Sequence, residues 1–459
     1  MIFDLTDLFS LILLVLGIFI IQKILLKYKL DFKQKIFVYF FICFNLYFFN
    51  YLKLFNLGVV SDFIGIRYFV FYTEDWFADL TKLVFSYQHL FDTNQLSEFN
   101  VPSNWIESNP YNIITTEGVP YGFHAPPIFV LITHVYGYIL KLLQLKFDII
   151  IFVTYFVFIS IYIKFLFSTI KKEDKYLTLF LFLFSYPVLF LLQRGNLMSL
   201  LVSLITFRLI TKFMSNEEFK VIDIFLLTFS VSHRPFLFLI GLLFLDFKSL
   251  KNSVNTFLKI LMTFLLTNFI YLRISSLLLD GYNLNSFLKG IRSYSINQIT
   301  GDGFNSSTFN LFLNIQDNSI VTTQYVMNNF DYFYLIQNFI LFIYLIVSLL
   351  ITYFYSKKYI SKLNYVSSLI AISVASSHPT GDYHLVIFLL MLLLVIKEKD
   401  NATDEYEFYT FIFLLLILPK PHTSNLNVLN PSLLINSVAL NIIIFKSIFF
   451  NKYIFLKKN

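Results

Sequence analysis

The amino-acid sequence predicts an all-α membrane protein, a polytopic bundle of about 11–13 transmembrane helices. Hydrophobic residues make up 57% of the 459 positions, the mean hydropathy is +0.70 and only 14% of residues are charged. A soluble domain of ordinary composition carries about 25% charged residues. Apolar runs also recur along the whole chain, many of them near the ~20 residues that a membrane-spanning helix needs. We therefore expect residues 1–459 to form one integral membrane domain.

The net charge of +7 is distributed in a way that argues against nucleic-acid binding. Lysines gather in short clusters between the apolar runs, for example at 171–175, 357–362 and 457–458. This is the pattern that the positive-inside bias produces in cytoplasmic loops. The single cysteine, Cys43, excludes an intrachain disulfide and a cysteine-based metal site.

The apolar runs define the expected helices one by one. In chain order they are 8–27, 36–56, 126–144, 148–169, 176–193, 196–211, 221–246, 254–272, 333–355, 363–377, 384–397, 408–418 and 429–450. Ser232-His233-Arg234-Pro235 interrupts the run 221–246, so we expect two short helices that meet at an aqueous face. The runs 363–377, 384–397 and 408–418 are too short to cross a full bilayer without tilt, local thinning of the bilayer or burial in the bundle.

The lysine clusters orient the chain from residue 212 onward. Residues 212–220, 247–253, 356–362, 397–407 and 451–459 are expected on the cytoplasmic side. The loop 273–332 and the short polar clusters then face the opposite side, as does the long loop 57–125. Between residues 36 and 211 the lysine clusters do not fall on alternating sides of the membrane across successive apolar runs, which indicates one partial or re-entrant helix.

The loop 57–125 is the longest polar stretch of the chain and carries paired acids. A helix over 75–91 would place an apolar stripe on one face and Asp75, Asp79 and Lys82 on another. Two carboxylates four residues apart tend to retain one proton, while Lys82 favours the ionised form of Asp79. Such a carboxylate suits a general base. The alternative is that these residues are only the solvated side of an amphipathic helix.

Two further motifs follow in the same loop. Tyr111 belongs to Asn109-Pro110-Tyr111, and His124 precedes Pro126-Pro127 at the start of the next apolar run. Proline is ordinary at a helix start. Here the pair would end the acidic loop and direct His124 toward it.

Basic residues interrupt the apolar runs on the predicted outer side. They are Arg194, His233, Arg234, His378, His384 and Lys420. Cations gathered at membrane depth suit an anionic headgroup, and a lipid-linked phosphate is the obvious candidate. Each one could instead be an interfacial anchor whose charge reaches water. A zinc site is a weak alternative, because no histidine pair has i,i+4 helical spacing.

The order of these motifs resembles the membrane-embedded C-type (GT-C fold) glycosyltransferases, and above all the bacterial polyprenyl-phosphate-mannose-dependent α-mannosyltransferases. The shared motifs are short and degenerate: an acidic motif (75–80), Asn-Pro-Tyr (109–111), a segment ending in Pro-Pro (123–127), Arg-Gly-Asn (194–196) and the stretch 378–384. The chain departs from the family in two respects. His124-Ala125 replaces the usual Tyr before Pro-Pro, and the loop is longer.

The resemblance implies inverting transfer of a sugar, mannose or another hexose, from a polyprenyl-phosphate donor to a glycan or lipid acceptor. The reaction would take place on the extracytoplasmic face of a bacterial inner membrane. Asp79 is the first candidate for the general base and Asp75 the second. The six basic residues would bind the donor phosphate, and His124, Tyr111 and Lys82 would belong to the substrate loop. No cofactor is implied, and a divalent metal stays open.

Two other functions remain open from the sequence. A secondary transporter would be expected to show inverted repeats and ionisable residues near the midplane of broken helices. No internal repeat is visible, and the charges lie toward segment ends. A polymerase or ligase of lipid-linked envelope polysaccharide would share the large outer loop and the basic clusters, and its donor would be a lipid-linked oligosaccharide.

Overall fold

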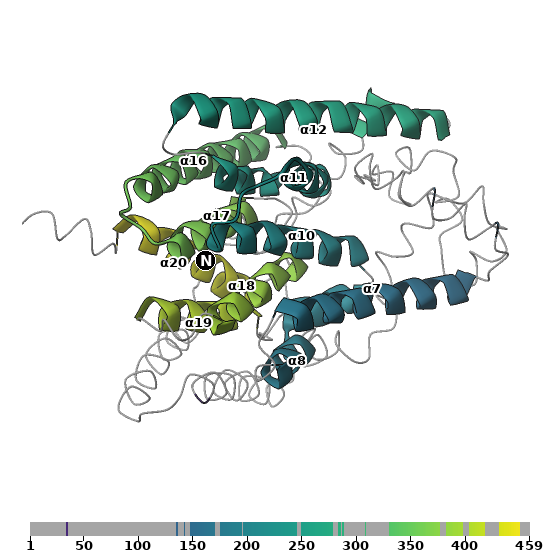
Figure 1. Cartoon of the computed structure of the whole chain (residues 1–459), viewed down its shortest axis with the longest axis horizontal. Coiled ribbons are helices and arrows are strands. Elements are labelled where there is room, and N and C mark those ends of the chain that lie inside the picture. Colours follow the sequence, from purple (N-terminus) through teal and green to yellow (C-terminus); the bar gives the residue numbers. More distant parts are fainter. Residues whose placement is uncertain are drawn as a thin grey trace, which may run out of the picture.

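The computed structural model describes the helical middle and C-terminal parts of the chain (Figure 1). The described residues are 147–169, 175–194, 196–245, 249–278, 330–376, 382–397, 404–417 and 431–449, with 34, 135, 142, 283–285, 287–288 and 308. All regular elements in these ranges are helices, so the all-α prediction is confirmed for this part of the chain. Predicted spans 8–27, 36–56 and 126–144, and the loop 57–125, lie outside it apart from Val135 and Leu142.

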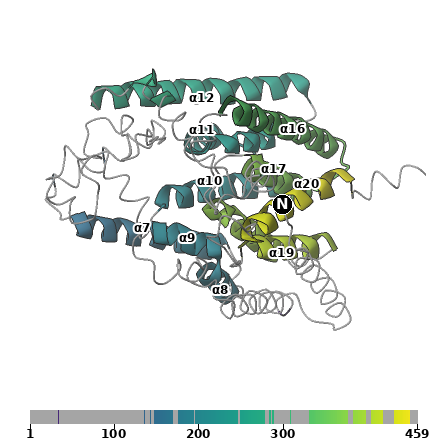
Figure 2. The same ribbon diagram turned by 180° about the vertical axis from the view of Figure 1, so that it is seen from behind.

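The helices follow the predicted apolar runs closely. They are α7 (Phe147–Thr169), α8 (Lys175–Phe184), α9 (Tyr186–Arg194), α10 (Leu197–Met214), α11 (Val221–His233), η7 (Pro235–Phe244), α12 (Leu250–Leu278), α16 (Phe330–Ser356), α17 (Lys362–Ser376), η8 (Asp382–Leu385), α18 (Val386–Lys397), α19 (Asp404–Ile417) and α20 (Pro431–Phe449). Both ribbon views place α12 along one edge and α7 and α8 toward the other, with α17 and α18 between them (Figures 1 and 2).

One predicted helix is wrong. The run 176–193 forms two helices, α8 and α9, that are separated at Ser185. Pro187 is the physical reason: it has no backbone N–H to donate into a continuing helix, but it is well placed in the first turn of a new one.

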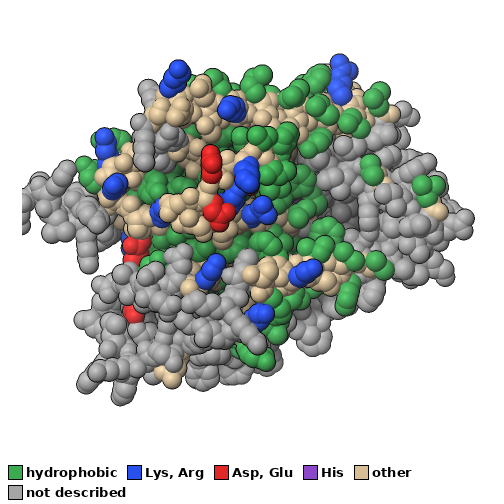
Figure 3. Space-filling view, in the orientation of Figure 1, with side chains coloured by type: hydrophobic (Ala, Val, Ile, Leu, Met, Phe, Trp, Pro, Cys, Tyr) green, Lys and Arg blue, Asp and Glu red, His purple; other side chains and the backbone are tan. Residues whose placement is uncertain are grey.

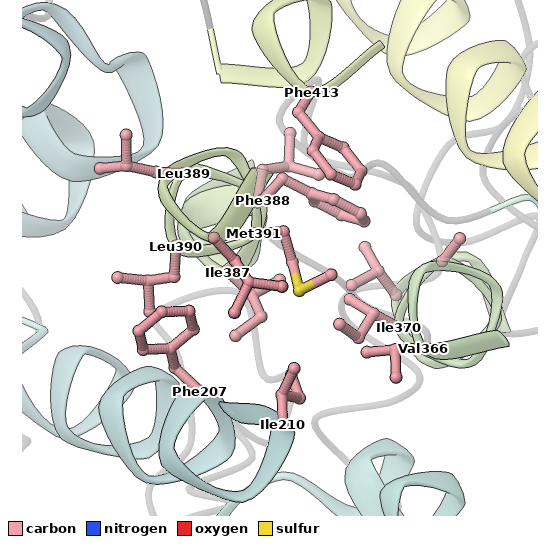
Figure 4. Packing of buried hydrophobic residues seen from close by; sticks show 14 of the residues in the cluster. Phe207, Ile210, Val366, Ile370, Ile387, Phe388, Leu389, Leu390, Met391 and Phe413 are labelled. Carbon is pink, nitrogen blue, oxygen red and sulfur yellow. The ribbon is translucent and has the colours of Figure 1, made fainter. Parts of the chain in front are cut away.

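The two most buried helices, α17 and α18, form the centre of the bundle. All side chains of 363–376 and 386–396 are buried. Figure 4 shows Met391 of α18 pointing toward Ile370 of α17, and Phe388 packed against Phe413 of α19 with ring centroids 5.6 Å apart. Phe207 of α10 closes the opposite side of α18. A helix that is apolar all round must be surrounded in this way.

Small and polar residues let α17 approach α20 closely. The hydroxyl oxygens of Ser368 and Ser447 lie 2.6 Å apart, and Ser368 also donates to the carbonyl of Ile443 at 3.3 Å. Tyr409 of α19 donates to the side-chain oxygen of Asn364. Hydroxyl and amide groups of this kind hold helices together where no water is present. They fix how α19 and α20 lie against the central helix.

The predicted break in 221–246 is confirmed, and it forms a helical hairpin. The chain runs out along α11 and returns beside it along η7. The two arms are in contact at their middles, where a Cβ atom placed on Gly241 of η7 would lie 3.5 Å from Leu227 Cδ2 of α11. At the other end of the hairpin, Phe219 stacks on Phe244 with centroids 4.0 Å apart. The second arm is a 3₁₀ helix rather than an α-helix. His233 and Arg234 therefore lie at the tip of the hairpin.

A buried ion pair fixes the base of this hairpin. Lys212 Nζ of α10 lies 2.6 Å from Asp223 Oδ2 of α11, and the backbone N–H of Lys220 donates to the same oxygen at 2.7 Å. The side chain of Asp223 is fully buried, so loss of the Lys212 cation would leave a buried carboxylate without its ion-pair partner. The pair ties the first arm of the hairpin to α10.

Two described helices, α12 and α16, are long and apolar enough to cross a membrane. Within Lys251–Leu277 and Asp331–Ser356, an apolar window of 18 residues has a mean hydropathy of 1.6 and 2.3, and only 6% and 22% of that window is buried. The core helix of a soluble protein would be mostly buried instead. Figure 3 shows hydrophobic side chains along α12. These helices support membrane association, and the number of spans in the whole chain stays a prediction.

Replacement of Phe388 by alanine should destabilise the bundle by about 3 kcal/mol, because it empties a close-packed site between α18 and α19. Phe342→Ala is the control, since Phe342 on α16 is 58% exposed and the change leaves no internal cavity. The measurement is the free energy of unfolding of the purified chain in detergent. Equal losses in the two variants would contradict the packing described for α18.

Candidate functional site

Three of the polar breaks in the chain meet at one end of the bundle. They are the α9–α10 junction at 194–197, the hairpin tip at 233–235 and the 3₁₀ turn η8. The contacts of η8 with α9 and α10, and of α10 with α11 and η7, bring them together. Residues far apart in the sequence are therefore neighbours at this junction.

The hairpin tip is built around Arg234. Its backbone N–H donates to the carbonyl of Ser230 at 2.7 Å and ends α11, while Pro235 begins η7. The proline fixes the start of the second arm because its backbone angle suits the first turn of a helix and it has no N–H to satisfy. His233 is the last residue of α11, so the two basic residues are adjacent at the turn.

The guanidinium of Arg234 is bound to the first turn of α10. Its Nη2 donates to Ser199 Oγ at 2.8 Å. The backbone N–H of Ser199 in turn donates to Oδ1 of Asn196, the N-cap of α10, at 3.2 Å. The N-terminus of a helix carries a partial positive charge, so α10 and Arg234 make this location favourable for an anion.

His384 of η8 is buried beside this pair. Its ring contacts Phe236 edge-on with centroids 5.3 Å apart. Phe236 follows Arg234 by two positions, so this contact places the imidazole of His384 at the hairpin tip. An imidazole can donate a hydrogen bond to an anion.

An apolar pocket adjoins the basic residues. It has a volume of about 440 Å³ and is lined by Pro235, Phe236, Phe238, Leu239, Gln337, Leu341, Tyr344, Leu345 and Ser376. This size is within the ~300–1,000 Å³ typical of small-molecule sites. Phe236 belongs to the pocket wall and also contacts His384, so one residue connects the pocket to the basic cluster.

The predicted site residues are distributed unevenly over the described chain. His233, Arg234 and His384 are brought together, and Arg194 is the last residue of α9 at the same junction. The remaining predicted residues lie outside the described residues: Asp75, Asp79, Lys82, Tyr111, His124, His378 and Lys420. Their roles stay predictions.

Two residues of this region were not predicted from the sequence. Ser199 lies in a run of apolar residues and looks like an ordinary helical serine, although the Asn-x-x-Ser spacing from Asn196 is a capping signal. Phe236 is one of 59 phenylalanines, and no local pattern distinguishes it. Both are recognisable only from contacts across the fold.

Comparison of the chain with protein-family models, with curated proteins and with solved structures gives no match. Within the described residues no three His, Cys, Asp or Glu side chains form a group that could hold a metal ion.

Proposed function

We propose that this chain is an integral membrane glycosyltransferase with a GT-C-like fold that uses a polyprenyl-phosphate sugar as donor. The sugar is mannose or another hexose, and the acceptor is a glycan or a lipid. The observation that carries the proposal is the meeting of His233, Arg234 and His384 beside an apolar pocket. Sequence resemblance supplies the class of reaction.

The basic cluster suits the phosphate of such a donor. Arg234 presents a planar guanidinium that can form paired hydrogen bonds to phosphate oxygens, and Ser199 holds it in place. His384 is buried beside it, and its imidazole can donate a further hydrogen bond to the phosphate. The positive end of α10 favours the same anion. These groups would also stabilise the polyprenyl phosphate when it leaves.

The pocket suits the hydrocarbon chain of the same donor. Leu239 and Phe238 of η7 form one side of it, and Leu341 and Leu345 of α16 form the other. The α16 helix is largely exposed, so a chain in the pocket could continue into surrounding lipid. A cationic end beside an apolar cavity matches an anionic amphiphile better than a free sugar phosphate, which has no apolar part.

The reaction assigned to the chain is an inverting substitution at the anomeric carbon. A carboxylate of the loop 57–125, Asp79 or Asp75, takes the proton of the acceptor hydroxyl. The hydroxyl oxygen forms the new bond to carbon from the face opposite the phosphate. The carbon–oxygen bond to the phosphate breaks, and its electron pair leaves with the polyprenyl phosphate. The step takes place on the extracytoplasmic side of a bacterial inner membrane.

Asp79→Asn should lower the transfer rate by about 10²- to 10⁴-fold, because asparagine cannot accept the hydroxyl proton. The measurement is transfer from radiolabelled polyprenyl-phosphate mannose to a pool of glycan or lipid acceptors, in detergent. Asp75→Asn is measured beside it, and a loss confined to that variant would move the base to Asp75. Wild-type transfer unaffected by both changes would exclude the assigned base. Failure of all lipid-linked sugar donors would favour the transporter, and use of a lipid-linked oligosaccharide alone would favour the polymerase or ligase.

Arg234→Met should raise the KM for the lipid donor by about 10- to 100-fold, which corresponds to the loss of a charged hydrogen bond to phosphate. Arg208→Met is the control, because Arg208 is exposed on α10 away from the hairpin tip. Both variants are assayed at saturating acceptor and at equal amounts of folded protein. An unchanged KM in Arg234→Met would remove the hairpin tip from the donor site.

A further inference from the structure

The contact between Ser199 and Arg234 joins two segments that are 35 positions apart in the sequence. Ser199 is buried, with 5% of its surface exposed, in the first turn of α10. Its backbone N–H is bound to the N-cap Asn196, so the serine is itself fixed by the start of the helix. Arg234 lies at the hairpin tip, where the chain has just left α11 and has not yet entered η7. The hydroxyl therefore holds the guanidinium from a neighbouring, rigid element.

We propose that Ser199 is a positioning residue that fixes the guanidinium of Arg234 for recognition of the donor phosphate. The inference rests on the proposed function and extends it to a residue outside the predicted set. Ser199 itself does not contact the phosphate. It acts through Arg234 by reducing the number of rotamers that the long side chain must give up when an anion binds.

The geometry favours this role over a purely structural one. A buried serine in a helix can satisfy its hydroxyl by donating to its own backbone, and Ser203, one turn later and equally buried, does so to the carbonyl of Leu200 at 2.7 Å. Ser199 instead accepts a hydrogen bond from a charged side chain of another element. Its oxygen constrains the direction of a cation, and a fixed cation is worth more to a ligand than a mobile one.

The test compares a phosphate with the neutral alcohol that has the same hydrocarbon chain. Full-length protein in detergent is titrated with farnesyl phosphate and with farnesol, and the ratio of the two dissociation constants measures recognition of the phosphate. Ser199→Ala should lower this ratio about fivefold, the value of one ordinary hydrogen bond. Ser203→Ala should leave it unchanged, and Ser199→Thr, which keeps the hydroxyl, should restore it.

A double variant checks that Ser199 acts through Arg234. If it does, Ser199→Ala adds little to the loss already caused by Arg234→Met, because the two changes remove one shared interaction. A full additional fivefold loss would overturn the positioning role. Equal weakening of both ligands by Ser199→Ala would also overturn it, since a structural defect affects the alcohol as much as the phosphate.

The outcomes separate this inference from the proposed function. A high wild-type ratio that Ser199→Ala does not change overturns the positioning role alone and leaves the phosphate site in place. A wild-type ratio near one overturns the phosphate site and the positioning role together. A high wild-type ratio that falls in Ser199→Ala supports the positioning of Arg234. If the assay for sugar transfer is negative at the same time, the proposed transfer reaction is overturned and the phosphate site is kept.

Discussion

The close approach of α17 to its neighbours is the constraint on which the rest of the structure depends. Its side chains are buried on every face, so α16, α20 and η7 must all pack directly on it. Small residues make this possible, and the Ser368–Ser447 contact sets how near α20 can come. The α18 helix is surrounded in the same way, and η8, which precedes it, packs against α9 and α10.

The helices of the described chain could be predicted largely from apolar runs, because a run of sufficient length has few alternatives to helix in an apolar protein. The break at Ser232–Pro235 was predictable for a local reason, namely a proline beside two basic residues. The return of the chain as a hairpin was not, because it depends on Gly241 meeting Leu227. The separation of α8 from α9 was missed, although Pro187 marks it, since the apolar run continues through it.

The residues of the candidate site also differ in whether the sequence predicts them. His233, Arg234 and His384 were recognisable because charged and titratable groups are rare within apolar runs. Ser199 and Phe236 were not, because a serine or a phenylalanine acquires its role only through the side chain opposite to it. Sequence could therefore name the charges of the site but not the groups that hold them. The acids of the loop 57–125 stay predictions from sequence.

The 3₁₀ form of η7 has a geometric consequence for the depth of the hairpin. Ten residues at a rise of ~2.0 Å cover about 20 Å, which matches the thirteen residues of α11 at ~1.5 Å each. The two arms thus have equal length in spite of unequal residue numbers, and the chain returns level with its start. A hydrocarbon layer of ~30 Å is roughly 10 Å thicker than this length. In a hairpin that started at one face of such a layer, Arg234 would lie below the other face, and a charged headgroup would have to sink to reach it.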